Sequence, residues 1–173
     1  MDLNIIPAIA FVACLFFSTT SHVVADQKRQ QPVRGEVASY EDESLNQNSD
    51  YNSILFYIKT KYKKVSDDDA NLIAKYLVKY GSEHDVDPKL TAALMARESA
   101  FNKEAVSSTG AKGLGQIKNF NFKTLQIEDP FDIQQNTYGT TKYMKYLMSS
   151  WQTNSEKVSL ALASYFKGIN AVK

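Results

Sequence analysis

The sequence predicts a mainly α-helical domain over residues 51–173, preceded by two segments of a different kind. Apolar residues recur every three or four positions from residue 51 onward, which is the periodicity of an amphipathic helix. No run shows the sustained apolar–polar alternation that is typical of a half-buried strand. Helix-start signals also precede several of the periodic stretches. These observations favour helices, with irregular structure around residues 102–133.

The first helices of this domain have clear boundary signals. Residues 51–61 have apolar side chains spaced for a short helix. Ser66 is followed by three aspartates, so a capping hydroxyl and then negative charge in the first turn would stabilise a helix N-terminus. We expect this second helix to end at Gly81, since glycine commonly terminates helices.

The third helix is the most apolar of the domain. It opens at Asp87-Pro88, because proline suits the first helical position. Residues 90–96 are apolar on nearly every side, which indicates a buried central helix. Two further helices are expected, over residues 136–150 and 155–167.

The first 50 residues have the composition of a targeting segment followed by a linker. Residues 5–17 form a 13-residue apolar run, which is too short to span a bilayer comfortably, and small residues near Ala25 suit a cleavage site. We therefore expect residues 1–25 to be a signal peptide. The absence of Lys and Arg before the apolar run leaves a retained N-terminal anchor open. Residues 26–50 are polar with a net charge of −3, which predicts a disordered polar linker.

The composition argues against several kinds of site. The 173 residues include a single cysteine, Cys14, and two histidines, so neither a disulfide framework nor a multi-histidine metal centre is expected. We expect no metal and no cofactor, and chemistry that depends on carboxyl, hydroxyl or amide groups. Residues 51–173 carry a net charge of +5, which fits an anionic polymer as partner or simply a solvated lysine surface. No nucleic-acid partner is predicted, because no helix-turn-helix pattern accompanies the basic residues.

Glu98 is unusual because it lies at the end of the apolar helix. The helix macrodipole disfavours an anion there, Leu94 precedes it by one turn on the same face, and Phe101 can pack over it. Lost solvation raises the pKa of a carboxyl group, and a raised pKa suits a general acid at neutral pH. The alternative is an ordinary glutamate that points to solvent or pairs with Arg97 or Lys103.

A glycine-rich segment follows at residues 107–117. Gly110, Gly113 and Gly115 lie within six residues, and glycine allows the backbone to approach a ligand closely. Gln116 has both a donor and an acceptor, which suits a sugar hydroxyl or acetamido group. The order of the glycines does not match a phosphate-binding loop, and an ordinary turn between helices is the alternative.

Several short motifs here resemble the catalytic core of the soluble lytic transglycosylases, which are relatives of goose-type lysozyme. That family has a Glu-Ser pair, a GA-x-GL-x-Q segment, an asparagine on a following helix and Ala-Tyr-Asn near a glycine. The corresponding motifs in this chain are Glu98-Ser99, GAKGLGQ at 110–116, Asn136, and Ser164-Tyr165-Phe166 before Gly168. The resemblance covers residues 66–173 and implies a lysozyme-like α-helical domain.

This resemblance also implies an activity, namely that of an exported peptidoglycan lytic transglycosylase. Such an enzyme cleaves the β-1,4 bond between N-acetylmuramic acid and N-acetylglucosamine. Glu98 would be the catalytic general acid and then the base, which gives a 1,6-anhydromuramoyl product. The residues that would bind the substrate are Ser107, Gln116, Asn136 and Tyr165.

The resemblance extends to location and partners. It implies a periplasmic or cell-envelope protein, exported by its N-terminal signal, with peptidoglycan glycan strands as its main partner. Envelope-spanning secretion or remodelling machinery is a further expected partner, and the protein is expected to be a monomer.

Two features depart from the family pattern. Phe166 stands where the family has asparagine, and it cannot supply the amide hydrogen bonds of that residue. The sequence also ends at Lys173, soon after this motif, where relatives usually continue with another helix. Two alternatives therefore stay open: a glycan-binding or scaffolding module with reduced or lost activity, and a lysozyme-type hydrolase.

Overall fold

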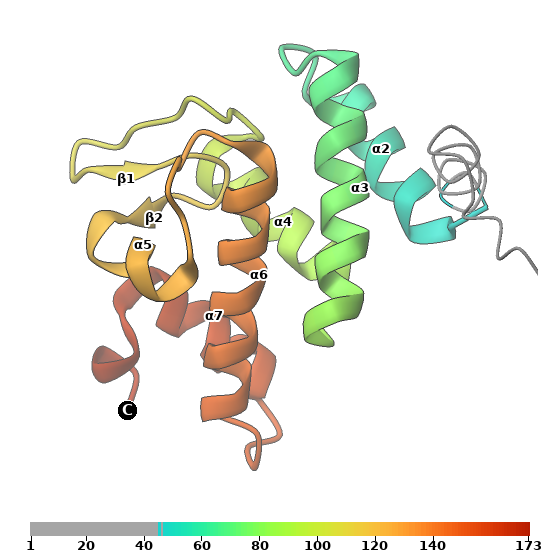
Figure 1. Cartoon of the computed structure of the whole chain (residues 1–173). Coiled ribbons are helices and arrows are strands. Elements are labelled where there is room, and N and C mark those ends of the chain that lie inside the picture. Colours follow the sequence, from blue (N-terminus) through green and yellow to red (C-terminus); the bar gives the residue numbers. More distant parts are fainter. Residues whose placement is uncertain (1–44, 46) are drawn as a thin grey trace, which may run out of the picture. The chain divides into compact units, whose positions relative to one another are not determined.

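The structure, a computed structural model, describes Leu45 and residues 47–173. The expected signal peptide and most of the expected linker lie outside the described residues. In the described part, no helix is long and apolar enough to cross a membrane. The fold is mainly α-helical, which confirms the predicted class (Figure 1). Its elements are α2 (Ser49–Lys61), α3 (Asp67–His84), α4 (Pro88–Ser99), β1 (Ala111–Lys112), β2 (Ile117–Lys118), α5 (Asn119–Leu125), α6 (Ile133–Ser150), α7 (Lys157–Lys167) and the 3-10 helix η1 (Ile169–Ala171).

Local capping explains where the first helices begin. The Ser66 side chain accepts a hydrogen bond from the backbone N–H of Asp69 at 3.1 Å, as predicted for the start of α3. The Asp87 carboxylate accepts one from the backbone N–H of Lys89 at 2.8 Å and caps α4, which confirms the second predicted start. Helix α2 begins at Ser49 rather than at residue 51, so the last residues of the expected linker are helical.

The predicted end of α3 at Gly81 is wrong. The helix continues to His84, and Asp85 ends it in the left-handed conformation with a φ of 52°. Gly81 has a different role, because a Cβ added to it would lie 2.8 Å from the carbonyl oxygen of Val86 and 3.2 Å from Pro88. The missing side chain therefore allows the turn between α3 and α4 to pack closely against the helix.

The segment from residue 102 to residue 133 is more regular than expected. It contains the antiparallel pair β1 and β2 and the short helix α5. Helix α6 begins at Ile133, earlier than predicted, because the Asp132 carboxylate accepts a hydrogen bond at 2.7 Å from the backbone N–H of Gln135. The hairpin and α5 form a small lobe beside α6 (Figure 1).

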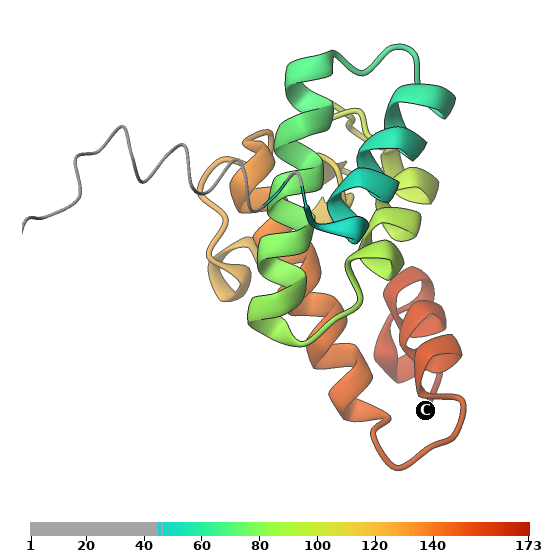
Figure 2. The same ribbon diagram turned by 90° about the vertical axis from the view of Figure 1, so that its right-hand side faces the viewer.

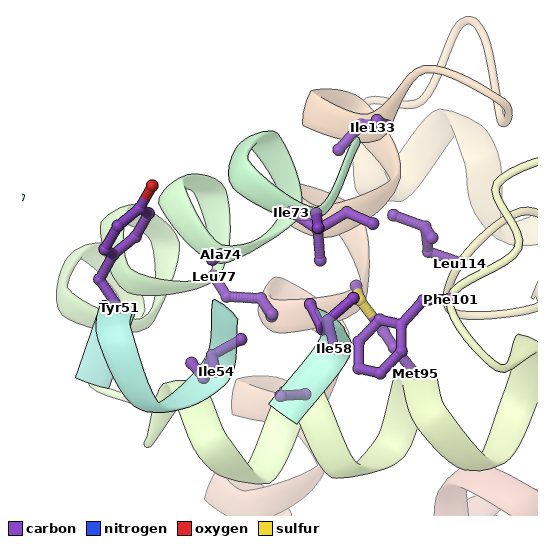
Figure 3. Close-up of a cluster of buried hydrophobic side chains, with 12 residues drawn as sticks. Tyr51, Ile54, Ile58, Ile73, Ala74, Leu77, Met95, Phe101, Leu114 and Ile133 are labelled. Carbon is purple, nitrogen blue, oxygen red and sulfur yellow. The ribbon is translucent and has the colours of Figure 1, made fainter. Parts of the chain in front are cut away.

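The helices of this domain pack mainly on α3 and α6, whose mutual contact is the most extensive in the described part. Helices α2 and α4 pack against α3, and α7 packs against α6 (Figures 1 and 2). Figure 3 shows the main apolar cluster, in which Ile58 of α2 and Met95 of α4 meet Phe101. Fully burying a side chain of this size contributes about 1.5–3 kcal/mol. The cluster therefore holds the C-terminal end of α4, with Glu98, in a fixed position.

Candidate functional site

A cavity of about 430 Å³ lies between the end of α4, the hairpin, α5, α6 and α7. Four of the five site residues predicted from the sequence line this cavity, although they come from distant parts of the chain: Glu98, Ser107, Gln116 and Tyr165. The fold thus brings the end of the apolar helix, the glycine-rich segment and the C-terminal motif together around one space.

Among the residues that the structure describes, Glu98 is the only one with a carboxyl group on the wall of this cavity. Its side chain is half-buried, and no hydrogen bond or ion pair from a described residue reaches the carboxylate. Burial raises the pKa of Glu98 above its usual range, and the positive charge of Arg97 lowers it by a smaller amount. The surroundings therefore favour the protonated carboxyl group. Among the described residues, no three His, Cys, Asp or Glu side chains lie close enough together to hold a metal ion.

Ser99 ties the end of α4 to the glycine-rich segment. Its hydroxyl donates to the carbonyl oxygen of Leu114 at 2.8 Å and has a longer contact of 3.2 Å with the carbonyl oxygen of Met95. The next two residues, Ala100 and Phe101, are both left-handed, with φ values of 52° and 59°. The helix therefore ends abruptly, and Glu98 is held at the edge of the cavity.

Tyr165 joins α7 to the glycine-rich segment. Its hydroxyl donates a hydrogen bond of 2.7 Å to the carbonyl oxygen of Gly115. Burial raises the pKa of Tyr165, and the negative charge of Glu98 raises it further. The phenol therefore stays neutral, and its proton is directed at Gly115 and not at the carboxylate.

Ser107 and Gln116 line the cavity and also hold the shape of the hairpin. The Ser107 hydroxyl accepts a hydrogen bond of 3.0 Å from the backbone N–H of Ala111. The side-chain Nε2 of Gln116 donates to the carbonyl oxygens of Ala105 at 3.1 Å and of Gly113 at 3.0 Å. The side-chain oxygen of Gln116 accepts no hydrogen bond from a described residue, so this acceptor is available to a ligand.

Asn136 lies inside the fold, with 0 % of its surface exposed, and does not line the cavity. Its Oδ1 accepts a hydrogen bond of 2.8 Å from the backbone N–H of Gly115. Its Nδ2 donates to the carbonyl oxygens of Lys112 at 3.2 Å and Pro130 at 2.8 Å. This one amide joins α6 to the glycine-rich segment and to the connection before α6. We therefore assign Asn136 to positioning of the loop, which differs from the expectation that it binds substrate.

Two exposed phenylalanines lie on the cavity wall, and the sequence does not predict that they share this position. Phe120 of α5 is 81 % exposed and Phe166 of α7 is 52 % exposed. Large apolar side chains are usually withdrawn from water, and an exposed aromatic ring beside a polar cavity is suited to a ligand that has apolar faces. Sequence patterns do not predict that either ring is exposed, because Phe120 lies in the segment expected to be irregular and Phe166 stands out in the sequence only as a departure from the family motif.

Known proteins resemble this chain over the part that contains the cavity. The family model described as the transglycosylase SLT domain matches residues 75–173. The membrane-bound lytic murein transglycosylase F of Pectobacterium atrosepticum is 36 % identical over 87 residues, which are 49 % of this chain and 18 % of that protein. The protein of the same name from Cronobacter sakazakii is 28 % identical over 138 residues, which are 78 % of this chain and 25 % of that protein. The chain therefore covers a quarter or less of the length of these two relatives.

Proposed function

The chain belongs to the family of the transglycosylase SLT domain, and from this premise we propose that it is a lytic transglycosylase of peptidoglycan. Both relatives are named as lytic murein transglycosylases. The bond cleaved would be the β-1,4 bond between N-acetylmuramic acid and N-acetylglucosamine. We also propose that the protein acts in the cell envelope, with residues 1–25 as export signal, followed by a linker and then by the transglycosylase domain, which begins with α2.

The observation that carries this proposal is that the described residues place one half-buried carboxyl group, and no second acid, on the wall of the cavity. Glycosidases that hydrolyse their substrates generally use two carboxyl groups, one as acid and the other as nucleophile or base. Of the described residues, only Glu98 offers a carboxyl group to this cavity, so we assign the second role to a group of the substrate. This favours an internal transfer within the sugar over hydrolysis by an activated water.

In the proposed reaction Glu98 acts twice. It first donates its proton to the bridging glycosidic oxygen, and the bond between that oxygen and C1 of the muramoyl ring breaks. The acetamido oxygen of the same ring stabilises the positive charge at C1. The Glu98 carboxylate then takes the proton of the C6 hydroxyl group, whose oxygen forms the new bond to C1. The acid is regenerated, no water is consumed, and the product has a 1,6-anhydro ring.

The direct test is to incubate the full chain with purified murein sacculi and to analyse the released muropeptides by chromatography and mass spectrometry. We expect fragments with 1,6-anhydromuramoyl ends, which are lighter by one water than the products of hydrolysis. Products with a reducing-end muramic acid would instead identify a lysozyme-type hydrolase. Binding to sacculi without any released fragment would identify a glycan-binding module.

The exposed phenylalanines should contribute to binding rather than to the chemical step. Sugar rings have a face of C–H groups that packs on aromatic rings, so Phe120→Ala and Phe166→Ala should each raise KM for murein about 3- to 10-fold, which corresponds to about 0.5–1.5 kcal/mol. We expect kcat to change less than about twofold. The matched control is Phe56→Ala, because Phe56 is 70 % exposed on α2 and does not line the cavity. Initial rates over a range of murein concentrations give KM and kcat separately. A fall in kcat at constant KM would contradict the assignment of these phenylalanines to substrate binding.

The pH dependence should report the raised pKa of Glu98. A general acid must be protonated at the start of the reaction, so kcat/KM should fall as the pH rises through the pKa of Glu98 in the folded chain. Because burial raises that pKa, this fall should lie above the range of an ordinary glutamate. Arg97 lowers the pKa of Glu98, so Arg97→Gln should move the fall to still higher pH. A profile that does not move in Arg97→Gln would argue that another group titrates.

A further inference from the structure

A second cavity lies on the other side of the turn that follows Glu98. Its volume is about 810 Å³, nearly twice that of the first cavity. One wall is formed by residues 61–65, from the end of α2 and the turn after it, and the other by residues 99–104, with Asp69 of α3 between them. This size is within the range of ligand sites in proteins.

The rim of the second cavity carries uncompensated positive charge. The Nζ atom of Lys103 lies 2.8 Å from the Asp69 carboxylate, so this pair is neutralised within the wall. The remaining lysines on this wall are Lys61, Lys63 and Lys64. No carboxylate in the described part of the chain forms an ion pair with them, and in that part Glu104 is the only other acid on the wall. The ammonium groups of these three lysines therefore attract anions.

The second cavity also has an apolar, aromatic lining. Phe101 is 2 % exposed, and its ring centroid lies 5.0 Å from that of Tyr62 in an edge-to-face arrangement. Val65, which is half-buried, adds a further apolar side chain. A basic rim above an apolar wall suits a ligand that has both carboxylates and apolar groups, as a short acidic peptide does, better than it suits a bare inorganic anion.

The two cavities meet at the end of α4. Glu98 lines the first cavity, and the next residue, Ser99, lines the second. Neighbouring Cα atoms are about 3.8 Å apart, so a ligand in the second cavity would rest on the turn that holds Glu98. In that turn Ala100 and Phe101 both have positive φ values, a strained conformation for a residue other than glycine, which tertiary packing must support.

Part of the second cavity comes from outside the segment that matches the family. The match begins at residue 75, whereas residues 61–65 and Asp69 precede it. The basic wall is therefore contributed by the segment that flanks the matched domain in this chain.

We propose that the second cavity binds the carboxylate-bearing peptide side chain of murein while the glycan strand lies in the first cavity. This inference rests on the proposed function, because the peptide is covalently attached to the muramoyl group of the same polymer. Lys61 and Lys64 bind carboxylates of the peptide, and the ring of Tyr62 packs against its apolar parts. The enzyme thereby distinguishes peptide-bearing strands from bare strands.

The kinetic test compares two substrates. The first is intact murein, and the second is the same glycan after an amidase has removed its peptides. In the full chain, Lys61→Ala combined with Lys64→Ala should raise KM for intact murein about 3- to 10-fold, because exposed ion pairs each contribute only modestly to binding. KM for the bare glycan should stay unchanged. The matched control is Lys79→Ala, which removes an exposed lysine of α3 that lines neither cavity and should alter neither value. An equal loss on both substrates, or no loss on either, would overturn the proposal.

A binding test does not depend on turnover. The full chain is titrated with the free peptide that the amidase releases, and the backbone amides of residues 100–104 are followed by NMR. We expect saturable shifts that disappear in the variant lacking Lys61 and Lys64, and no shifts at all would refute the inference. If the peptide binds but the chain releases no fragments from murein, the proposed function fails while the binding site stands.

Discussion

Replacing Glu98 with glutamine should lower the rate of murein cleavage at least about a hundredfold, because general acid–base catalysis typically contributes 10²–10⁴-fold. Glutamine has nearly the same shape but cannot donate a proton to the glycosidic oxygen or accept one from the C6 hydroxyl group. The measurement is the initial rate of release of 1,6-anhydromuropeptides from sacculi. As a control, Glu128→Gln makes the same change at an exposed position outside the cavity and should keep full activity. More than a tenth of the wild-type rate in Glu98→Gln would refute the assignment.

The same variant should be at least as stable as the wild type, which separates lost chemistry from lost folding. Burial raises the pKa of Glu98 in the folded chain, so the stability that its protonated form contributes is complete below the unfolded-state pKa of about 4.3 and is lost as the pH rises through the folded-state pKa. Glutamine stays neutral at every pH. Urea unfolding curves should therefore agree near about pH 4, and at about pH 8 the wild type should be the less stable of the two. A less stable variant at the higher pH would mean that unfolding contributes to its loss of activity.

The largest loss of stability is expected from Gly113→Ala. Gly113 has a φ of 73°, and a Cβ there would overlap the carbonyl oxygen of Pro130 and the side-chain Nδ2 of Asn136. Those two atoms are hydrogen-bonded to each other at 2.8 Å, so neither can move without loss of the bond that fixes the loop. We expect the free energy of unfolding to fall by more than about 3 kcal/mol, with loss of activity because the cavity wall shifts.

Gly110→Ala is the matched control for this experiment. Gly110 has a similar φ of 78°, but a Cβ there would have no atom within 4 Å. Its replacement therefore tests the backbone conformation alone and should cost about 1–2 kcal/mol. Urea unfolding gives the loss in free energy of unfolding for each variant, and the difference between the two losses reports the cost of the steric overlap at Gly113. Equal losses at the two positions would show that Gly113 is needed only for its backbone conformation.

Features that depend on neighbouring residues in the chain were predictable. The starts of α3 and α4 follow from Ser66 and from Asp87-Pro88, because a capping side chain bonds to backbone groups only two or three residues away. The apolar periodicity likewise predicts the helical class, since it depends on which residues share a helix face. The resemblance of the short motifs also led to four residues that line one cavity, including Glu98.

Features that depend on contacts between distant segments were not predictable in this way. Gly81 looks like a helix end, yet its role is set by Val86 and Pro88, which pack against it across a turn. Asn136 looks like a substrate ligand, yet the loops around it use both ends of its amide. For Gly81 and for Asn136, the residue type fits both the role predicted from the sequence and the role found in the structure. Only the neighbours in three dimensions distinguish the two roles.

The amino-acid sequence by itself determined the helical class, the two capped helix starts and the acidic residue at the end of the apolar helix, because each depends on local spacing and local hydrogen bonds. Only the tertiary structure decided which side chains share a cavity, that Phe120 and Phe166 stay exposed there, and that a second basic cavity adjoins Glu98. The reason is physical: solvation, pKa and cavity shape depend on every group within a few ångströms, and packing brings those groups from segments that are far apart in the chain.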